Sequence, residues 1–159
     1  MAIRNILKSD DDLLRKTSRP VTKFDKRLHI LLDDMKETLA GVNGVGLAAP
    51  QVGVLRRVFI VSDGEKVIEC INPEIISSDG EIEDVEGCLS IPGVFGYVAR
   101  PQTVRIRAYD RDGNIFEAEG SEIMARAFCH ETEHLDGKLF DRLITRPYDP
   151  EADKEEENP

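Results

Sequence analysis

Cysteine and long apolar runs are both scarce in this sequence of 159 residues. It has three cysteines, and an odd, sparse number of them excludes a disulfide framework and fits a reducing compartment. No apolar run approaches the roughly 20 residues that a membrane-spanning helix requires. Residues 1–4 also lack the basic and apolar regions of a signal peptide. We therefore expect a cytoplasmic protein that makes no use of a membrane.

An excess of positive charge is also missing. The chain has 21 lysines and arginines against 31 aspartates and glutamates, which gives a formal net charge of -10. This balance argues against a nucleic-acid backbone as the main partner, although it is compatible with a local basic patch. Hydrophobic residues at 40% and charged residues at 33% are typical of one globular domain that buries a core without disulfide bonds.

Hydrophobic periodicity predicts the helices. Leucine and methionine recur at helical spacing over residues 24–40, which predicts an amphipathic helix of about four turns that ends at Gly41. Acidic residues followed by paired leucines predict a short capped helix over residues 9–16. A second long helix is predicted to have Ser121 as its N-cap, to run to about Asp136 and to end at Gly137.

Runs of β-branched residues around Asp-Gly turns predict antiparallel strand pairs. We expect residues 57–62 to pair with 66–71, residues 74–85 to form a strand pair after a break at Asn72-Pro73, and residues 103–109 to pair with 114–119. The expected fold class is α+β, with short antiparallel sheets packed around the C-terminal helix and an N-terminal helix besides. One domain is expected over residues 1–147, followed by an acidic, disordered tail over residues 148–159.

The C-terminal helix contains the pattern HExxH, at residues 130–134. Histidines four residues apart lie on one face of a helix, so the imidazoles of His130 and His134 can reach one metal ion. Glu131 lies close enough to that face to act on a water molecule at the metal. The pattern therefore predicts that this helix binds a metal ion.

A helical wheel places these three side chains within the arc of the apolar stripe, so they point into the protein. The predicted exposed side has Ala125, Thr132 and Asp136 instead. An unpaired imidazole or carboxylate inside the protein is costly, and a metal ion removes that cost. The inward direction favours a metal site over an ordinary surface helix.

A catalytic zinc-type site uses three protein ligands and an open position, so the helix supplies one ligand too few. On the wheel Cys129 faces away from the metal, and Glu133 lies beside Arg126, where pairing or solvation is expected. Cys70 lies in a predicted strand and is expected in the core. Cys88 is left, and the residues alone do not decide whether it is a ligand or a buried structural cysteine.

One further histidine, His29, lies on the first long helix with no ligand partner at helical spacing, so no metal site is predicted there. The segment Gly44-x-Gly46-x-x-Ala49 mimics a dinucleotide-binding fingerprint. That fingerprint has to follow a strand and open a helix, whereas this segment follows a helix, and Pro50 and Gly53 oppose a helix after it. We therefore expect a loop or irregular strand over residues 44–51 and no nucleotide cofactor.

Three segments occur in the order of the signature motifs of the peptide deformylases. They are GVGLAAPQ at residues 44–51, EGCLS at residues 86–90 and HExxH at residues 130–134. Each motif is modest alone, but the three in order are highly specific. The sequence thus resembles, over residues 6–143, a family of enzymes that remove the N-formyl group from newly made polypeptides.

The resemblance implies a metal site and its chemistry. Cys88 would be the third metal ligand, with His130 and His134, and the metal would usually be Fe²⁺, or Zn²⁺ in some members. Glu131 corresponds to the general acid and base of the family. The side chain of Gln51 would donate a hydrogen bond to the formyl oxygen.

The resemblance also implies how the substrate binds. The backbone N–H of Leu89 would donate to the same formyl oxygen, and Val45 and Gly46 would bind the substrate backbone as an added strand. The implied partner is an N-formylmethionyl peptide, including nascent chains at the ribosome. The sequence departs from the family pattern in two places. Glu133 occupies a position that is commonly aspartate, and we expect that function is retained with glutamate there. Residues 93–97 lack a basic residue found in some members.

Three other readings of the motif compete with a deformylase. A metalloendopeptidase shares HExxH, but such proteases usually add a glutamate or histidine as the third ligand. An inactive deformylase-like binding protein is disfavoured because Gln51, Cys88 and Glu131 are all intact. A structural metal site is disfavoured because only three strong ligands are visible and a glutamate stands at the water position.

Overall fold

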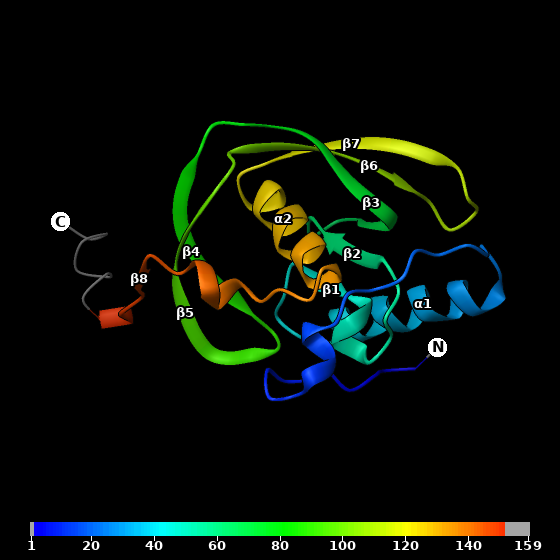
Figure 1. Cartoon of the computed structure of the whole chain (residues 1–159), viewed down its shortest axis with the longest axis horizontal. Coiled ribbons are helices and arrows are strands. Elements are labelled where there is room, and N and C mark those ends of the chain that lie inside the picture. The colour runs from blue at the N-terminus through cyan, green and yellow to red at the C-terminus, as the bar shows by residue number, and fades with distance from the viewer. Residues whose placement is uncertain (1, 152–159) are drawn as a thin grey trace.

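The computed structural model describes residues 2–151 and has an α+β fold (Figure 1). A five-stranded antiparallel sheet has the order β1-β2-β3-β6-β7, and a three-stranded antiparallel sheet has the order β4-β5-β8. The strands are β1 Gly46–Ala48, β2 Val58–Ser62, β3 Val67–Asp79, β4 Ile82–Cys88, β5 Ile91–Arg100, β6 Thr103–Tyr109, β7 Ile115–Ser121 and β8 Arg146–Pro147. The helices are α1 Lys26–Ala40 and α2 Ile123–Leu135, with short 3₁₀ helices η1 Asp12–Arg15, η2 Ala49–Val52 and η3 Phe140–Leu143.

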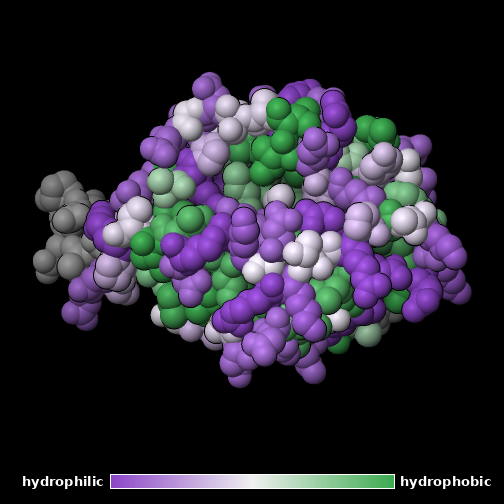
Figure 2. Space-filling view, viewed as in Figure 1, coloured by the Kyte–Doolittle hydropathy of each residue, from purple (hydrophilic) through white to green (hydrophobic). Residues whose placement is uncertain are grey.

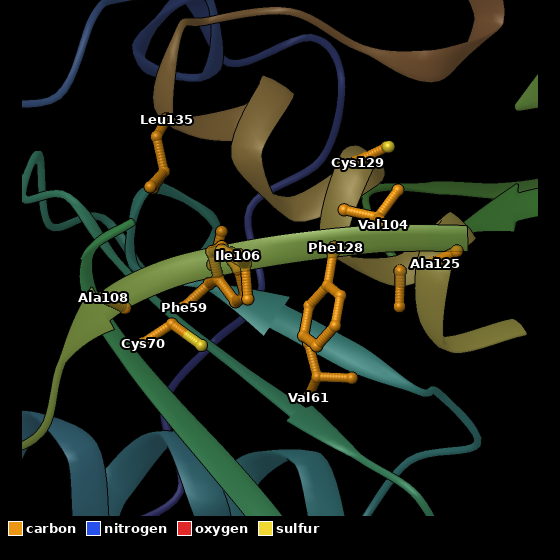
Figure 3. Packing of buried hydrophobic residues seen from close by; sticks show 12 residues of the cluster. Phe59, Val61, Cys70, Val104, Ile106, Ala108, Ala125, Phe128, Cys129 and Leu135 are labelled. Atoms are coloured by element: carbon orange, nitrogen blue, oxygen red, sulfur yellow. The ribbon is translucent and has the colours of Figure 1, made fainter. Parts of the chain in front are cut away.

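Strand β2 explains how the larger sheet holds both long helices. Its first four residues are apolar and fully buried, and successive side chains of a strand point to opposite faces. Val58 and Ile60 pack into the cluster on the α1 side, whereas Phe59 and Val61 pack into the cluster on the α2 side, with Phe128 of α2 (Figure 3). The sheet is therefore a central layer with one helix on each face.

Helix α1 matches its predicted range to within two residues at its start. Asp25 is the N-cap, and its carboxylate accepts a hydrogen bond from the Leu28 backbone N–H at 3.2 Å. The helix ends at Ala40 with Gly41 as its C-cap, as predicted. The short helix predicted over residues 9–16 is the 3₁₀ helix η1, and the carboxylate of Asp11 caps it.

Helix α2 ends as predicted but begins differently. Ser121 is the last residue of β7, and its hydroxyl lies 3.2 Å from that of Thr103, so the prediction that Ser121 caps the helix was wrong. Glu122 is the N-cap, with φ of 56° and no side-chain capping bond. One residue therefore makes the whole connection between strand and helix. At the other end, Gly137 has φ of 72° and its N–H donates to the His134 carbonyl at 3.1 Å.

Two of the three predicted hairpins are confirmed. Strands β2 and β3 pair across the turn at residues 63–66, and strands β6 and β7 pair across the turn at residues 110–114. The strand pair predicted within residues 74–85 was wrong, because the two strands separate at Gly80 into different sheets. Strand β3 continues along β6, and β4 pairs with β5.

Two local features misled the strand prediction. Residues Asn72-Pro73 do not interrupt β3, because the Asn72 side chain takes up both backbone hydrogen bonds of Val21, at 2.7 and 2.9 Å, and holds the strand through an irregular register. Strand β5 was not predicted, because its glycines and Pro92 are typical of turns. Strand β5 instead lines the cavity of the site described below.

The exposed side of α2 was also predicted wrongly in part. Ala125 is fully buried, whereas Ile123 is 62% exposed. Ala125 packs with Phe128 into the core on the larger sheet, whereas Ile123 faces the cavity described below, and α2 also contacts β5 of the smaller sheet. A wheel with one apolar face does not describe a helix that is covered on two sides.

No helix in the described part of the chain combines the length and apolar character that a bilayer crossing demands. Hydrophilic side chains cover much of the face in Figure 2 and separate several hydrophobic patches. Most of the tail predicted over residues 148–159 lies outside the described residues, which end at Glu151.

Candidate metal centre

Helix α2 and the end of β4 bring together the three side chains that were predicted as metal ligands. His130 and His134 lie one turn apart on α2, are both buried, and have ring centroids 4.9 Å apart. The Sγ atom of Cys88 lies 3.4 Å from Nε2 of His134. One ligand atom from each of the three residues lies within 4.8 Å of the others. This is the geometry of a site that could hold a metal ion.

The surroundings of this cluster fit a cation. Nδ1 of His130 lies 2.7 Å from a carboxylate oxygen of Glu86, which orients the ring and leaves its other nitrogen for a ligand bond. Burial opposes a charge on His130, but the negative charge of Glu131 and hydrogen bonds to Cys88 and Glu86 raise its pKa to about 10. The sulfur and imidazole donors of the cluster suit iron or zinc.

Two buried polar atoms beside the cluster have no hydrogen-bond partner among the described residues. They are Oε1 of Glu131 and Nδ1 of His134. Burial raises the pKa of Glu131 to about 7, while the positive charge of His130 acts in the opposite direction. Burial also holds the pKa of His134 well below its ordinary value, and so does the positive charge of His130. Buried polar atoms are rarely left unpartnered, so Oε1 of Glu131 marks a place for another group at the cluster. Nδ1 of His134 lies on the side of its ring away from Nε2, which faces Cys88.

Gly46 brings the backbone of β1 against Glu131. A methyl group at Gly46 would lie 2.8 Å from Oε2 of Glu131, closer than any ordinary contact. Only glycine allows this approach, because any other residue would push the carboxylate aside. The GVGLA segment and the HExxH helix are therefore in direct contact here, and the contact requires glycine at position 46.

Gln51 is held at the same place from η2. Its Oε1 accepts a hydrogen bond from the Ala48 backbone N–H at 2.9 Å, and its Nε2 donates to the Ser90 hydroxyl at 3.1 Å. The same Nε2 lies 3.7 Å from Sγ of Cys88. The carboxamide is 1% exposed and is fixed with its donor end at the metal cluster.

A cavity of about 630 Å³ opens onto this cluster. Strands β1 and β4 lie at the edges of the two different sheets, and residues from both of them line the cavity. Val45 and Gly46 border it on the β1 side, and Leu89 lies on the other side, in the tight turn from β4 into β5. All residues predicted to bind metal or substrate, or to act in catalysis, therefore line this cavity or lie directly beside it; His134 is the one that lies behind the lining.

Three charged residues behind the cluster were missed by the sequence reasoning. Glu86 accepts hydrogen bonds from Arg100 at 2.7 and 3.1 Å and from Arg126 at 3.0 Å, in addition to its contact with His130. Burial would raise the pKa of Glu86, but the bonds from His130 and Arg100 lower it to about 2. Glu86 could have been recognised from its spacing to Cys88, since residues two apart share one face of a strand. Nothing in the sequence indicates the two arginines.

Glu133, the residue at the position that is commonly aspartate, has other partners than the one predicted. It pairs with Arg100 at 2.8 Å and with Arg142 at 3.2 Å, and it belongs to no metal-ligand group among the described residues. The prediction that Glu133 is paired and is not a ligand is confirmed, although Arg126, its neighbour on the helical wheel, pairs with Glu86 instead. Through Arg100, Glu133 joins the network that orients His130.

The other candidate ligands lie elsewhere. Cys70 is fully buried in the core on the α2 side, where burial raises its pKa far above the ordinary range. Cys129 packs into the same core. Nε2 of His29, in the first turn of α1, lies 2.8 Å from the carbonyl oxygen of Arg111. All three were predicted to lie outside the metal site, and none of them belongs to the ligand group found among the described residues.

Comparison with known proteins gives one consistent result. The model of the polypeptide deformylase family matches residues 3–147. The peptide deformylase of Alkaliphilus metalliredigens is 56% identical over 145 residues, which is 91% of this chain and 99% of that protein. Crystal structures of peptide deformylases from Legionella pneumophila and Thermotoga maritima are 44% and 38% identical, with TM-scores of 0.87 and 0.88. Each covers 91% of this chain, and the matches span 87% and 99% of those chains. The chain belongs to the peptide deformylase family.

Proposed function

We propose that this protein hydrolyses the N-formyl group of formyl-methionyl polypeptides and releases formate and a free amino terminus. The observation that carries the proposal is the convergence of Cys88, His130 and His134 beside Glu131 and Gln51, at the cavity between two edge strands. A metallopeptidase would use a glutamate or histidine as third ligand, whereas a cysteine sulfur is the third donor here.

A divalent metal ion fits the three donors, with Cys88, His130 and His134 as its ligands. Bound there, such an ion would polarise the formyl carbonyl and make water nucleophilic near neutral pH. We propose Fe²⁺ as the native ion, with Zn²⁺ as the alternative, because both accept sulfur and nitrogen donors. A thiolate ligand beside iron would also make the protein sensitive to oxidation.

Glu131 is proposed as the general base and acid. Its raised pKa, about 7, lets it take a proton from the attacking water and give it up again near neutral pH. Water adds to the formyl carbon, the carbon–nitrogen bond breaks, and Glu131 returns the proton to the leaving amine nitrogen. The unpartnered Oε1 of Glu131 is the atom that would carry this proton.

Gln51 and Leu89 are proposed to stabilise the negative charge that develops on the formyl oxygen. The fixed carboxamide of Gln51 presents Nε2 at the cluster, and the backbone N–H of Leu89 would add a second donor. One such donor is typically worth about 3 kcal/mol of transition-state stabilisation.

The peptide is proposed to bind as an extended strand along the cavity. Val45 and Gly46 precede and begin the edge strand β1, whose only strand partner among the described residues is β2, so its other edge is open to a peptide backbone. We further propose that the natural substrates are nascent chains at the ribosome and that the protein acts in the cytoplasm, where formylated chains are made.

An anaerobic assay tests the proposal. Formate release would be measured on a formyl-methionyl peptide and on the same peptide without the formyl group, with metal content determined on the same sample. We expect formate from the first peptide and no cleavage of the second. A filled metal site without formate release would contradict the proposal, and cleavage of the unformylated peptide would favour a metallopeptidase.

A further inference from the structure

A second cavity, of about 580 Å³, lies away from the metal cluster. It is formed where the chain that leads into α1 passes the connection between η2 and β2, and none of its lining residues line the cavity at the cluster. Four positive side chains line it: Arg19, Lys23, Arg27 and Arg56. We call it the cationic groove. Its one acidic lining residue is Asp25.

The arginines of the cationic groove differ from all others in the chain. Every arginine outside it has a carboxylate within ion-pair distance. Within the described residues, Arg19, Arg27 and Arg56 have no such partner, and neither has Lys23. In a protein with a net charge of -10, acidic partners are plentiful, so unpaired arginines gathered in one groove need a separate explanation.

The backbone holds two of these arginines side by side. Arg19 forms a parallel β-bridge with Arg56, supported by hydrogen bonds from the Arg19 N–H to the Leu55 carbonyl and from the Arg57 N–H to the Arg19 carbonyl. Like charges at facing positions repel. Asp25 does not relieve them, because its carboxylate accepts from the Leu28 N–H as the helix cap and forms no ion pair. An external anion would relieve this repulsion.

We propose that the cationic groove binds the phosphodiester backbone of RNA. Guanidinium groups match phosphate oxygens with two parallel hydrogen bonds, and several of them spread along a groove fit a polymer better than a single phosphate. The acidic remainder of the surface repels a polyanion and thereby limits contact to this groove. The choice of RNA over an acidic peptide rests on the proposed function, because formylated chains are made on an RNA-containing particle.

Binding of a labelled single-stranded RNA, followed by fluorescence anisotropy at several salt concentrations, tests this proposal. The groove variant is Arg19→Ala/Lys23→Ala/Arg27→Ala, in which all three replaced side chains are exposed. The matched control is Lys66→Ala/Arg107→Ala/Lys138→Ala, which removes the same charge from exposed positions elsewhere. Arg56→Gln serves as a second, independent groove variant.

We expect the wild type to bind RNA with an affinity that falls steeply with salt. The groove variant should bind at least about 10-fold more weakly, and the slope of log affinity against log salt should flatten by roughly 3, about 1 for each lost phosphate contact. The control should bind within about 2-fold of wild type. Equal losses in both variants, or no binding at low salt, would overturn the proposal. Displacement by polyglutamate as effective as by RNA would point to an acidic peptide instead.

Hydrolysis of a free formyl-methionyl peptide separates this inference from the proposed function. The groove variants should hydrolyse it at the wild-type rate, because the groove shares no residue with the metal cluster. If the wild type hydrolyses the peptide but does not bind RNA, only the groove proposal is contradicted. RNA binding without any hydrolysis would instead remove the proposed function and leave the groove as a binding site.

Discussion

The two long helices cover opposite faces of one sheet, but they differ in how their buried polar side chains are hydrogen-bonded. On α1, the buried side chains of Asp34 and Thr38 are both fully engaged. Asp34 accepts from the Ala2 N–H at 2.7 Å and from Arg4 at 2.9 Å, and Thr38 accepts from the Arg4 N–H and donates to the Asp34 carbonyl. These bonds fix the N-terminal segment to the helix.

On α2, buried polar groups are instead left open. Oε1 of Glu131 and Nδ1 of His134 lack partners, although the residues around them form a dense network of charges. Unsatisfied burial of this kind costs about 1–3 kcal/mol for each group. Glu37 on α1 also has one unpartnered carboxylate oxygen, but it belongs to no metal-ligand group among the described residues, whereas the two open groups of α2 lie at the metal cluster. The comparison therefore separates a helix built for stability from a helix built for chemistry by where the open groups lie.

The variant Glu131→Gln tests the chemical role of α2 most directly. The amide has nearly the same shape but cannot accept the proton, so kcat/KM on a formyl-methionyl peptide should fall by about 10²–10⁴-fold. Metal content and the urea midpoint should be unchanged or higher. A variant with near-normal formate release would show that Glu131 is not the base.

The matched control is Glu37→Gln on α1. Glu37 also has one buried carboxylate oxygen without a partner, but it belongs to no metal-ligand group among the described residues. Its replacement should leave formate release within about 2-fold of wild type. An equal loss in both variants would mean that the effect comes from burial and not from the position of Glu131.

A second prediction concerns the contact between β1 and Glu131. Gly46→Ala would place a methyl group 2.8 Å from Oε2 of a carboxylate that is only 4% exposed, so the carboxylate has to move. A displacement near 1 Å can cost on the order of 10²-fold in rate, and we expect a loss of 10- to 100-fold in kcat/KM with the metal retained. Gly41→Ala is the control, since its nearest contact is 3.7 Å. Unchanged kinetics would show that the exact place of Glu131 is unimportant.

The sequence allowed good prediction of features that depend on local pattern. Helix α1 was recognisable because its apolar residues repeat at helical spacing, and HExxH placed His130 and His134 together because four residues make about one turn. Cys88 could not be assigned by such reasoning, since it is far from α2 in the chain. The motif resemblance assigned it, and the structure places its Sγ 3.4 Å from His134.

Features that depend on non-local packing were not predictable in this way. The turn at Gly80 was correctly recognised, but which sheet each flanking strand joins depends on β5 and β6, which follow later in the chain. The burial of Ala125 depends on the larger sheet, which packs against that side of α2. Arg100 and Arg126 converge on Glu86 from two different elements, and no spacing in the sequence connects them.

The network behind His130 gives a third prediction. Glu86→Gln would weaken the bond that orients His130, leave Arg126 without its counter-charge and leave Arg100 with Glu133 as its remaining one. Loss of such a partner typically lowers metal affinity about 10- to 100-fold, which competition with a chelator would measure. Arg142→Ala removes only a half-exposed partner of Glu133 and should change metal affinity by less than about 2-fold. Tight metal binding by the Glu86 variant would show that the network is structural only.

The smallest predicted effect is on the α1 side. Burial alone would raise the pKa of Asp34, but the hydrogen bonds from Arg4 and Ala2 lower it below its ordinary value. Asp34→Asn should therefore reduce the free energy of unfolding by about 1–2 kcal/mol near pH 7, measured by urea denaturation, with activity unchanged.

The pH dependence of that loss identifies its cause. A carboxylate with a lowered folded pKa stabilises the protein at every pH above its unfolded pKa, about 4, and loses this contribution as the pH falls through the folded value. The gap in unfolding free energy between wild type and Asp34→Asn should thus be constant above about pH 5 and shrink in more acidic solution, where the wild-type side chain also becomes neutral. Asp112→Asn, at an exposed loop position, should show no gap beyond about 0.5 kcal/mol at any pH. A gap that stayed constant into acid would mean that Asp34 stabilises the fold through its shape and hydrogen bonds alone, and the charge on the α1 side would then have no role in holding the N-terminal segment.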